Sequence, residues 1–233
     1  MILSKKHQFI FLKTSKTAGT SFEIALSKYA GPDDIITPIS EEDERLRSTL
    51  GYCGPQNHLH NEAGHTWTKR GNSSRQKFYN HNTPAEILNL VGAPLFSSLL
   101  KVSIVRNPFD MAVSRYFWDH RNQQNLPATH FREWLLSRPS VLLMNRDMTH
   151  IKDTCVVDVM IRFEAFETDI PEFSRKVGLP DTVYDEFRSI RVKSSHRPHC
   201  ASAAAMFDGF EDGKLVIREM FEEDIKLYGY SLS

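Results

Sequence analysis

The sequence has few cysteines and no long hydrophobic run. Its three cysteines, Cys53, Cys155 and Cys200, are odd in number, lie far apart and form no Cys-x-x-Cys pair. This pattern argues against a disulfide framework and predicts a reduced, cytoplasmic setting. No stretch approaches the roughly 20 apolar residues of a membrane-spanning helix. Residues 1–7 also lack the apolar core and cleavage site of a signal peptide.

The chain also lacks net charge. Its 29 lysine and arginine residues balance 29 aspartate and glutamate residues. This balance argues against general binding of nucleic acids or anionic membranes, but it allows a local basic pocket. Of the 233 residues, 40% are hydrophobic, which is enough for a sheet covered by helices. We therefore expect one domain over residues 1–233.

Apolar segments that alternate with helical patterns set the expected fold. We expect strands at residues 7–12, 100–105 and 156–163, and helices at residues 19–29, 108–118 and 164–177. A further helix is expected to start at Thr83, which is followed by proline and, three residues on, by Glu86. Such alternation predicts an α/β fold with a central, mainly parallel sheet. Ligands bind such sheets beyond the carboxyl ends of the strands.

A segment rich in lysine and hydroxyl groups follows the first expected strand. Residues 13–21 read Lys-Thr-Ser-Lys-Thr-Ala-Gly-Thr-Ser and lead into a helix. Backbone N–H groups at a glycine-containing loop and a helix N-terminus bind phosphate or sulfate groups well. A Walker A loop is excluded, because Lys16 precedes Gly19 and no Gly-Lys-Ser/Thr occurs in the chain. The segment therefore predicts an anion site of another kind.

A second motif follows the expected strand at residues 100–105. Arg106 ends that strand, Asn107 and Pro108 begin the next helix, and Ser114 lies within it. A guanidinium group offers a planar fork of donors that suits phosphate oxygens, and a hydroxyl group completes such a shell. Taken alone, Arg-Asn-Pro is also an ordinary strand-to-helix turn. The pattern thus predicts either a second phosphate site or a turn.

Together, the two motifs resemble the nucleotide site of sulfotransferases that use 3′-phosphoadenosine 5′-phosphosulfate (PAPS). Residues 16–21 are similar to their 5′-phosphosulfate loop, and residues 105–110 with Ser114 are similar to their 3′-phosphate motif. Residues 78–87, 157–169 and 221–230 resemble further blocks of the carbohydrate type, sulfotransferase family 2-like. Ser15 stands where the family often has proline, and Met111 replaces a commonly basic residue.

This resemblance implies a P-loop-like, three-layer α/β/α fold and transfer of a sulfuryl group from PAPS to a hydroxyl of a carbohydrate or other small acceptor. Lys16 would be catalytic, beside the bridging oxygen of the phosphosulfate. Arg197 lies in a late basic segment that resembles a loop closing over the nucleotide, and a solvated turn is its alternative. The implied cofactor-binding residues are Lys16, Thr17, Ala18, Gly19, Thr20, Ser21, Arg106, Ser114 and Arg197.

His81 is the expected general base. An unperturbed imidazole titrates near ~6.5, so it can accept a proton around neutrality. The resemblance places a catalytic histidine in this region, although other members use glutamate. A structural or surface role for His81 is the alternative, and the candidate bases would then be Glu41, Glu42, His58 and His60.

The irregular segment at about residues 37–75 is expected to be an insert that binds the acceptor. Its histidines His58, His60 and His65 crowd one stretch, but no cysteine or carboxylate pattern completes a metal site, so no metal is expected. Two rival functions remain: a P-loop-type kinase or phosphotransferase, which would need magnesium ligands, and a non-catalytic module that binds the nucleotide. No motif indicates the acceptor's identity or the oligomeric state.

Overall fold

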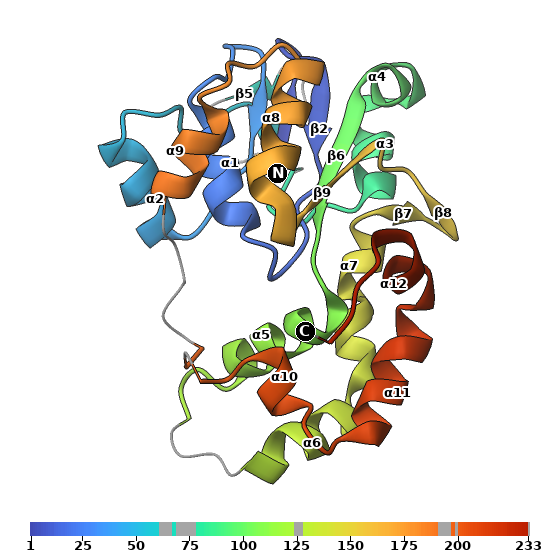
Figure 1. Ribbon diagram of the computed structural model, residues 1–233. Helices are drawn as coiled ribbons and strands as arrows, with labels where there is room; N and C mark the ends of the chain where they lie inside the picture. The colour runs from blue at the N-terminus through green and yellow to red at the C-terminus, as the bar shows by residue number, and fades with distance from the viewer. Residues whose placement is uncertain (61–66, 69–77, 124–127, 191–196, 199, 233) are drawn as a thin grey trace. The chain divides into compact units, whose positions relative to one another are not determined.

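The computed structural model describes residues 1–60, 67–68, 78–123, 128–190, 197–198 and 200–232 (Figure 1). By their internal contacts, the residues form two compact units. Unit 1 comprises Met1–Val105 and Arg146–Val192, and unit 2 comprises Arg106–Asn145 and Lys193–Ser233. The chain therefore passes from unit 1 to unit 2 directly after an expected strand, between Val105 and Arg106.

Unit 1 contains a sheet of five strands in the described part of the chain. In spatial order these are β3 (Ile35–Ile36), β1 (Ile2–Ser4), β2 (Phe9–Phe11), β6 (Leu100–Val105) and β9 (Val159–Arg162). β2 pairs parallel with β6, and β6 pairs parallel with β9. β1 is antiparallel to both of its neighbours, so the other strands all run in one direction. The α/β fold with a central, mainly parallel sheet is confirmed.

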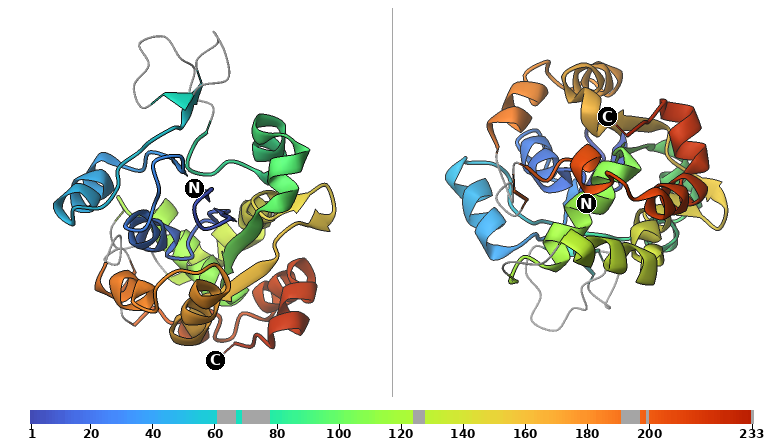
Figure 2. Two further views of the ribbon diagram at one scale, coloured as in Figure 1. Left: turned by 90° about the horizontal axis from the view of Figure 1, so that it is seen from above. Right: turned by 60° about the horizontal axis from the view of Figure 1, so that its bottom comes forward.

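Helices cover both faces of this sheet (Figures 1 and 2). The helices α1 (Gly19–Ser27), α8 (Phe166–Lys176) and α9 (Val183–Ser189) pack on one face, and α3 (Pro84–Val91) and α4 (Ala93–Ser98) pack on the other. The strand residues alternate accordingly: Phe9 and Phe11 join the core with α1, whereas Ile10 joins the core with α3 and α4. This is the expected three-layer arrangement.

The segment from residue 37 to residue 60 is more regular than the sequence predicted. A helix, α2 (Glu41–Thr49), occupies its charged part. Ser40 caps this helix by accepting a hydrogen bond from the backbone N–H of Asp43, and Asp43 and Arg47 are buried. The expectation of irregular structure is wrong here because α2 is stabilised by a cap and by buried charged groups, not by an apolar face. Residues 61–66 and 69–77 of the insert lie outside the described residues.

The remaining elements of unit 1 are short. They include a 3-10 helix, η2 (Phe163–Ala165), which leads into α8. The strand pairs are β4 (Leu59–His60) with β5 (Trp67–Thr68), and β7 (His150–Ile151) with β8 (Thr154–Cys155). Helix α7 (Met144–Asp147) lies where the chain returns from unit 2 to unit 1.

In the described part of unit 2, all regular elements are helices. Its elements are α5 (Pro108–Asp119), α6 (Ala128–Ser137), the 3-10 helix η1 (Pro139–Leu143), α10 (Ala203–Met206), α11 (Glu211–Met220) and α12 (Glu222–Tyr228). Its core is aromatic and includes Phe109, Phe131, Trp134 and Phe207. Unit 2 thus has a core of its own, separate from the two cores that flank the sheet.

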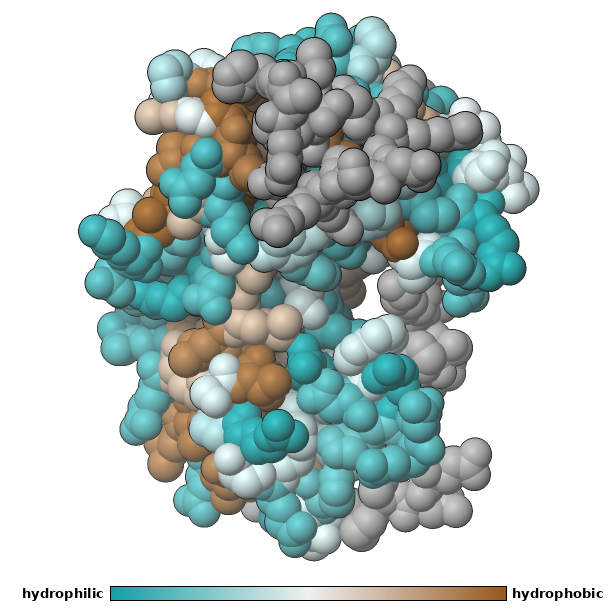
Figure 3. Space-filling view, turned by 180° about the vertical axis from the view of Figure 1, so that it is seen from behind, coloured by the Kyte–Doolittle hydropathy of each residue, from teal (hydrophilic) through white to brown (hydrophobic). Residues whose placement is uncertain are grey.

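The surface is mixed in polarity. Figure 3 shows hydrophobic residues in several separate areas among hydrophilic ones. Within the described residues, no helix has both the length and the apolar character needed to cross a bilayer.

Candidate functional site

The expected anion loop lies between β2 and α1, beside the neighbouring strand β6. The backbone N–H of Leu12 donates to the carbonyl of Val102 at 2.8 Å, which extends the parallel pairing past the end of β2. The Thr14 hydroxyl donates to the carbonyl of Ile104 at 2.7 Å. These two bonds fix the residues on both sides of Lys13, so the loop leaves the sheet from a rigid base.

The backbone of this loop adopts a conformation that side chains disfavour. Lys16 has a φ of 64° and Ala18 a φ of 59°, in the left-handed region that costs a non-glycine residue roughly 1–2 kcal/mol. Such strain is concentrated at ligand-binding loops, and left-handed residues turn successive N–H groups toward a common point. Such a conformation is typical of anion-binding loops.

Helix α1 begins at Gly19 without a side-chain cap. Its N-cap residue, Ala18, has no side-chain oxygen to accept from the N–H groups of the first turn. By contrast, Thr83 caps α3 through a complete capping box, and Asn107 caps α5. The first N–H groups of α1 and its positive dipole end are therefore directed at the loop, and this arrangement suits a phosphate or sulfate group.

Gly19 also makes room for a buried side chain below the loop. A Cβ atom at Gly19 would lie 3.0 Å from Cγ of Lys13, closer than side chains normally approach. Thr17 is buried, and its hydroxyl lies 2.9 Å from that of Thr14. Ser21 is buried in the first turn of α1, and Thr20 is half-buried. The loop is thus packed tightly on its inner side.

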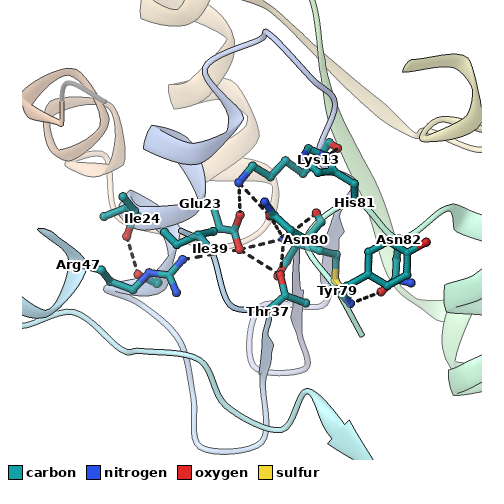
Figure 4. Close-up of polar contacts among 12 residues, drawn as sticks. Lys13, Glu23, Ile24, Thr37, Ile39, Arg47, Tyr79, Asn80, His81 and Asn82 are labelled. Atoms are coloured by element: carbon teal, nitrogen blue, oxygen red, sulfur yellow. Dashed lines mark hydrogen bonds and ion pairs between the residues drawn. The ribbon is translucent and has the colours of Figure 1, made fainter. Parts of the chain in front are cut away.

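Lys13 is almost fully buried, and its ammonium group contacts both α1 and the turn before α3 (Figure 4). Its ammonium group donates to Oε2 of Glu23 at 2.8 Å and to Oδ1 of Asn80 at 2.9 Å. Glu23 also lies 2.9 Å from the Met1 amino group and 3.6 Å from Arg47. Burial alone would raise the pKa of Glu23, but these cations lower it to about 2. Glu23 is therefore an anion at all moderate pH values.

His81 is held by the same lysine. Its Nδ1 atom lies 2.9 Å from the backbone carbonyl oxygen of Lys13. A carbonyl oxygen only accepts hydrogen bonds, so Nδ1 carries the proton and Nε2 keeps a lone pair. Burial lowers the pKa of His81 below its ordinary value of 6.5, although the bond to the carbonyl opposes this effect. The imidazole is therefore neutral at pH 7, as a general base must be.

The other candidate bases have less support. Glu41 and Glu42 are exposed on the first turn of α2. Burial lowers the pKa of His58 below its ordinary value of 6.5. The side chain of His60 and the whole of His65 lie outside the described residues. Within the described ranges, no group of three or more His, Cys, Asp or Glu residues has the arrangement of a metal site.

The second predicted motif lies in unit 2 and is organised by Asp110. Arg106 donates to Oδ2 of Asp110 through Nε at 2.7 Å, and Arg197 donates to Oδ1 through Nη1 at 2.5 Å. Burial alone would raise the pKa of Asp110, but the two guanidinium groups lower it below its ordinary value of 3.8. Ser114 is half-buried on the same face of α5, one turn after Asp110. The structure thus brings together Arg106 and Arg197, which lie far apart in the sequence.

The predicted site residues therefore form two groups, one in each unit. Lys16, the loop at residues 17–21 and His81 belong to unit 1, whereas Arg106, Ser114 and Arg197 belong to unit 2. Sequence reasoning missed Lys13 and Asp110 as organising residues. The spacing of four residues from Arg106 to Asp110 is a signal for the second.

Comparison with known proteins agrees with this geometry. The sequence model of a family described as "Sulfotransferase family" matches residues 1–231. A protein of Archaeoglobus fulgidus, described as an uncharacterized protein, is 31% identical over 100 residues, which are 41% of this chain and 81% of that protein. No solved structure matches this one.

Proposed function

Because this chain belongs to the sulfotransferase family, we propose that it transfers a sulfuryl group from PAPS to a hydroxyl group of a carbohydrate or another small hydroxylated acceptor. Family membership by itself supports a sulfotransferase in general. The donor, the acceptor class and the residue roles below are the proposal. The carbohydrate preference rests on the resemblance of the sequence to carbohydrate-type members.

The observation that carries the proposal is the loop between β2 and α1. Lys16 and Ala18 are left-handed there, and α1 begins without a side-chain cap. Backbone N–H groups of residues 17–21, with the hydroxyls of Thr20 and Ser21, would bind the 5′-phosphosulfate. Lys16 would lie near the bridging oxygen, where charge develops as the bond to sulfur breaks.

The arginine pair in unit 2 supports a second anionic contact. Arg106 and Arg197 both contact Asp110, so two guanidinium groups are held in one place. We assign these arginines, with Ser114, to the 3′-phosphate that distinguishes PAPS from ordinary adenine nucleotides. A planar guanidinium group can donate two parallel hydrogen bonds to the oxygens of one phosphate group. The insert around residues 37–75 is the proposed acceptor-binding region.

The chemistry is an in-line displacement at sulfur. The acceptor oxygen forms a new bond to sulfur while the bond from sulfur to the 5′-phosphate oxygen breaks. The hydroxyl proton goes to Nε2 of His81, and 3′-phosphoadenosine 5′-phosphate (PAP) leaves as an anion stabilised by Lys16. No redox partner is needed, and no metal has a role in the proposed step.

The proposed enzyme has one domain and a cytoplasmic location. Residues 1–233 would form one sulfotransferase domain, since the family model matches residues 1–231. We also propose a cytoplasmic location, since Cys53 is half-buried, Cys155 and Cys200 are exposed, and none of the three forms a disulfide bond.

The test is a transfer assay with PAPS labelled with ³⁵S in the sulfuryl group. The purified chain is incubated with panels of oligosaccharides and small alcohols, and labelled products are separated from PAPS. We expect a labelled product that is absent with Lys16→Ala. Transfer of phosphate from ATP, dependent on magnesium, with no labelled product from PAPS would contradict the proposal.

A further inference from the structure

Two neighbouring residues, Asn80 and His81, are both bound by Lys13. The Lys13 ammonium group donates to Oδ1 of Asn80 at 2.9 Å, and the Lys13 carbonyl oxygen lies 2.9 Å from Nδ1 of His81. One residue thus holds the turn before α3 through both its side chain and its backbone. Figure 4 shows Lys13 reaching Glu23 and Asn80, with His81 beside it.

We propose that Lys13 is a positioning residue for His81, which it holds with Nε2 as the proton acceptor, and that Asn80 and Glu23 keep Lys13 in place. This inference rests on the proposed function only in treating His81 as the base. The positioning itself is a property of the folded chain and can be measured without any substrate.

The backbone half of this contact is rigid. The carbonyl of Lys13 lies between two residues bonded to β6: Leu12 through its N–H to Val102, and Thr14 through its hydroxyl to Ile104. The carbonyl therefore cannot turn away from His81 without loss of sheet hydrogen bonds. Because it accepts only, it selects the Nδ1–H tautomer.

The side-chain half explains why a lysine is buried here. An ammonium group out of water needs both an opposite charge and hydrogen-bond acceptors. Glu23 supplies the charge, and Asn80 supplies a neutral acceptor from the turn that carries His81. If Lys13 served only to neutralise the charge of Glu23, its second hydrogen bond would not have to go to the turn that carries His81. The contact with Asn80 thus links the turn to α1.

The far side of the same turn is also fixed. Oδ1 of Asn82 accepts from the N–H of Tyr79 at 2.6 Å, and the Thr83–Glu86 capping box starts α3. His81 therefore lies between a capped helix on one side and Lys13 on the other. Its ring is hydrogen-bonded through Nδ1 to the carbonyl of Lys13, so its orientation depends on that residue.

Two sets of variants separate positioning from folding. Asn80→Ala removes the contact with the turn but leaves the Lys13–Glu23 pair intact. The double variant Lys13→Met with Glu23→Gln removes both charges of this pair. The Met1 amino group and Arg47 then lose their contact with Glu23, and Arg47 keeps its ion pair with Glu44. Asn89→Ala, at an exposed position on α3, is the matched control for loss of an asparagine. Thermal unfolding and backbone NMR spectra establish that each variant is folded.

The readout is the tautomer of His81, observed by ¹⁵N NMR of the histidine rings of the full chain. The chain has ten histidines, and the His81→Gln spectrum identifies the signals of His81. We expect the wild type and Asn89→Ala to show the Nδ1–H tautomer. We expect Asn80→Ala and the double variant to show a mixture of the two tautomers of His81.

Either of two results would contradict the positioning role of Lys13. An Nε2–H tautomer in the wild type, or unchanged His81 signals in folded Asn80→Ala and in the folded double variant, would overturn the positioning role. Should the double variant fail to fold, Asn80→Ala alone decides. Calorimetric titration with PAP on the same samples tests the proposed function separately, since it can fail while the tautomer result stands.

Discussion

Nδ1 of His81 lies 2.9 Å from the backbone carbonyl oxygen of Lys13, three residues before Lys16. The proposed base is therefore attached to the same loop as the lysine proposed to stabilise the leaving group. Both residues belong to unit 1, and the loop that carries Lys13 and Lys16 follows the carboxyl end of β2, the edge at which α/β sheets bind ligands. The contact between His81 and Lys13 thus links the proposed base to Lys16, the proposed leaving-group lysine.

Replacement of the base should slow chemistry without affecting donor binding. We expect His81→Gln to lower kcat by about 10²- to 10⁴-fold, the usual contribution of a general base. The Kd for PAP, measured by calorimetry, should stay unchanged because the proposed partner of His81 is the acceptor hydroxyl and not the donor. The turnover assay uses the acceptor found with labelled PAPS. Full activity of His81→Gln would move the base to another residue, with His58 and His60 as the first candidates.

The pH dependence of kcat should report the environment of His81. Burial lowers the pKa of this imidazole below 6.5, and only the neutral form accepts a proton. Activity should therefore rise from acid pH along a limb whose midpoint lies below 6.5. The measurement is kcat from pH 4.5 to pH 8 at saturating PAPS. An acid limb centred above 6.5, or none at all, would be inconsistent with this base.

Loss of Lys16 should affect the transition state more than the bound nucleotide. We expect Lys16→Ala to lower kcat by about 10²- to 10³-fold, as for removal of one oxyanion-stabilising donor, with little change in the Kd for PAP. Lys152→Ala is the matched control, because Lys152 is also left-handed, with a φ of 55°, but lies in the turn between β7 and β8. Equal effects of the two substitutions would remove the special role of Lys16.

Loss of Arg106 should be specific for ligands with a 3′-phosphate. Removal of a charged hydrogen-bonding partner costs about 1.5–3 kcal/mol, or roughly 10- to 100-fold in Kd. We expect Arg106→Ala to weaken PAP binding by this factor and to leave adenosine 5′-phosphosulfate unaffected. Arg218→Ala, at an exposed position on α11 of the same unit, is the control. Equal losses for both ligands would show that Arg106 does not read the 3′-phosphate.

Glu23 should govern stability in acid. Its pKa is lowered from 4.5 to about 2, so the stabilisation from its charged form is complete above pH 4.5 and is lost as the pH falls toward 2. We expect Glu23→Gln to lower the free energy of unfolding at pH 7 by about 3–5 kcal/mol, because buried cations lose their partner. The variant should also flatten the decline between pH 4.5 and pH 2. Denaturant unfolding across this range, with exposed Glu172→Gln as control, measures both effects; parallel curves would exclude this role.

The parts of the fold that have strong local patterns could be predicted from the sequence. The strand at residues 100–105 and the capped start of α3 are found where they were expected. The strands β1 and β3 have only three and two residues, too few for an alternating pattern, and they exist because they pair with each other beside β2. Helix α2 was missed because its buried face is charged and not apolar.

The site also contains some residues that the sequence predicted and others that only the fold reveals. The loop around Lys16 and the arginine at the end of β6 were predicted because strand ends and phosphate-binding residue types are visible in the sequence. Lys13 reads as a solvated charge, and only the fold shows that Glu23 and Asn80 bury it. Asp110 reads as a helix-start residue, and its contact with Arg197 depends on a chain reversal that no local pattern encodes.

The central claim is that the chain binds a nucleotide with a 3′-phosphate and a 5′-anion. The most direct test is calorimetric titration of the purified chain with PAP, beside titration with ATP plus magnesium. If the proposed function is right, the chain binds PAP tightly without a metal and binds ATP weakly. Absence of PAP binding together with clear, magnesium-dependent ATP binding would contradict it and would indicate a phosphotransferase.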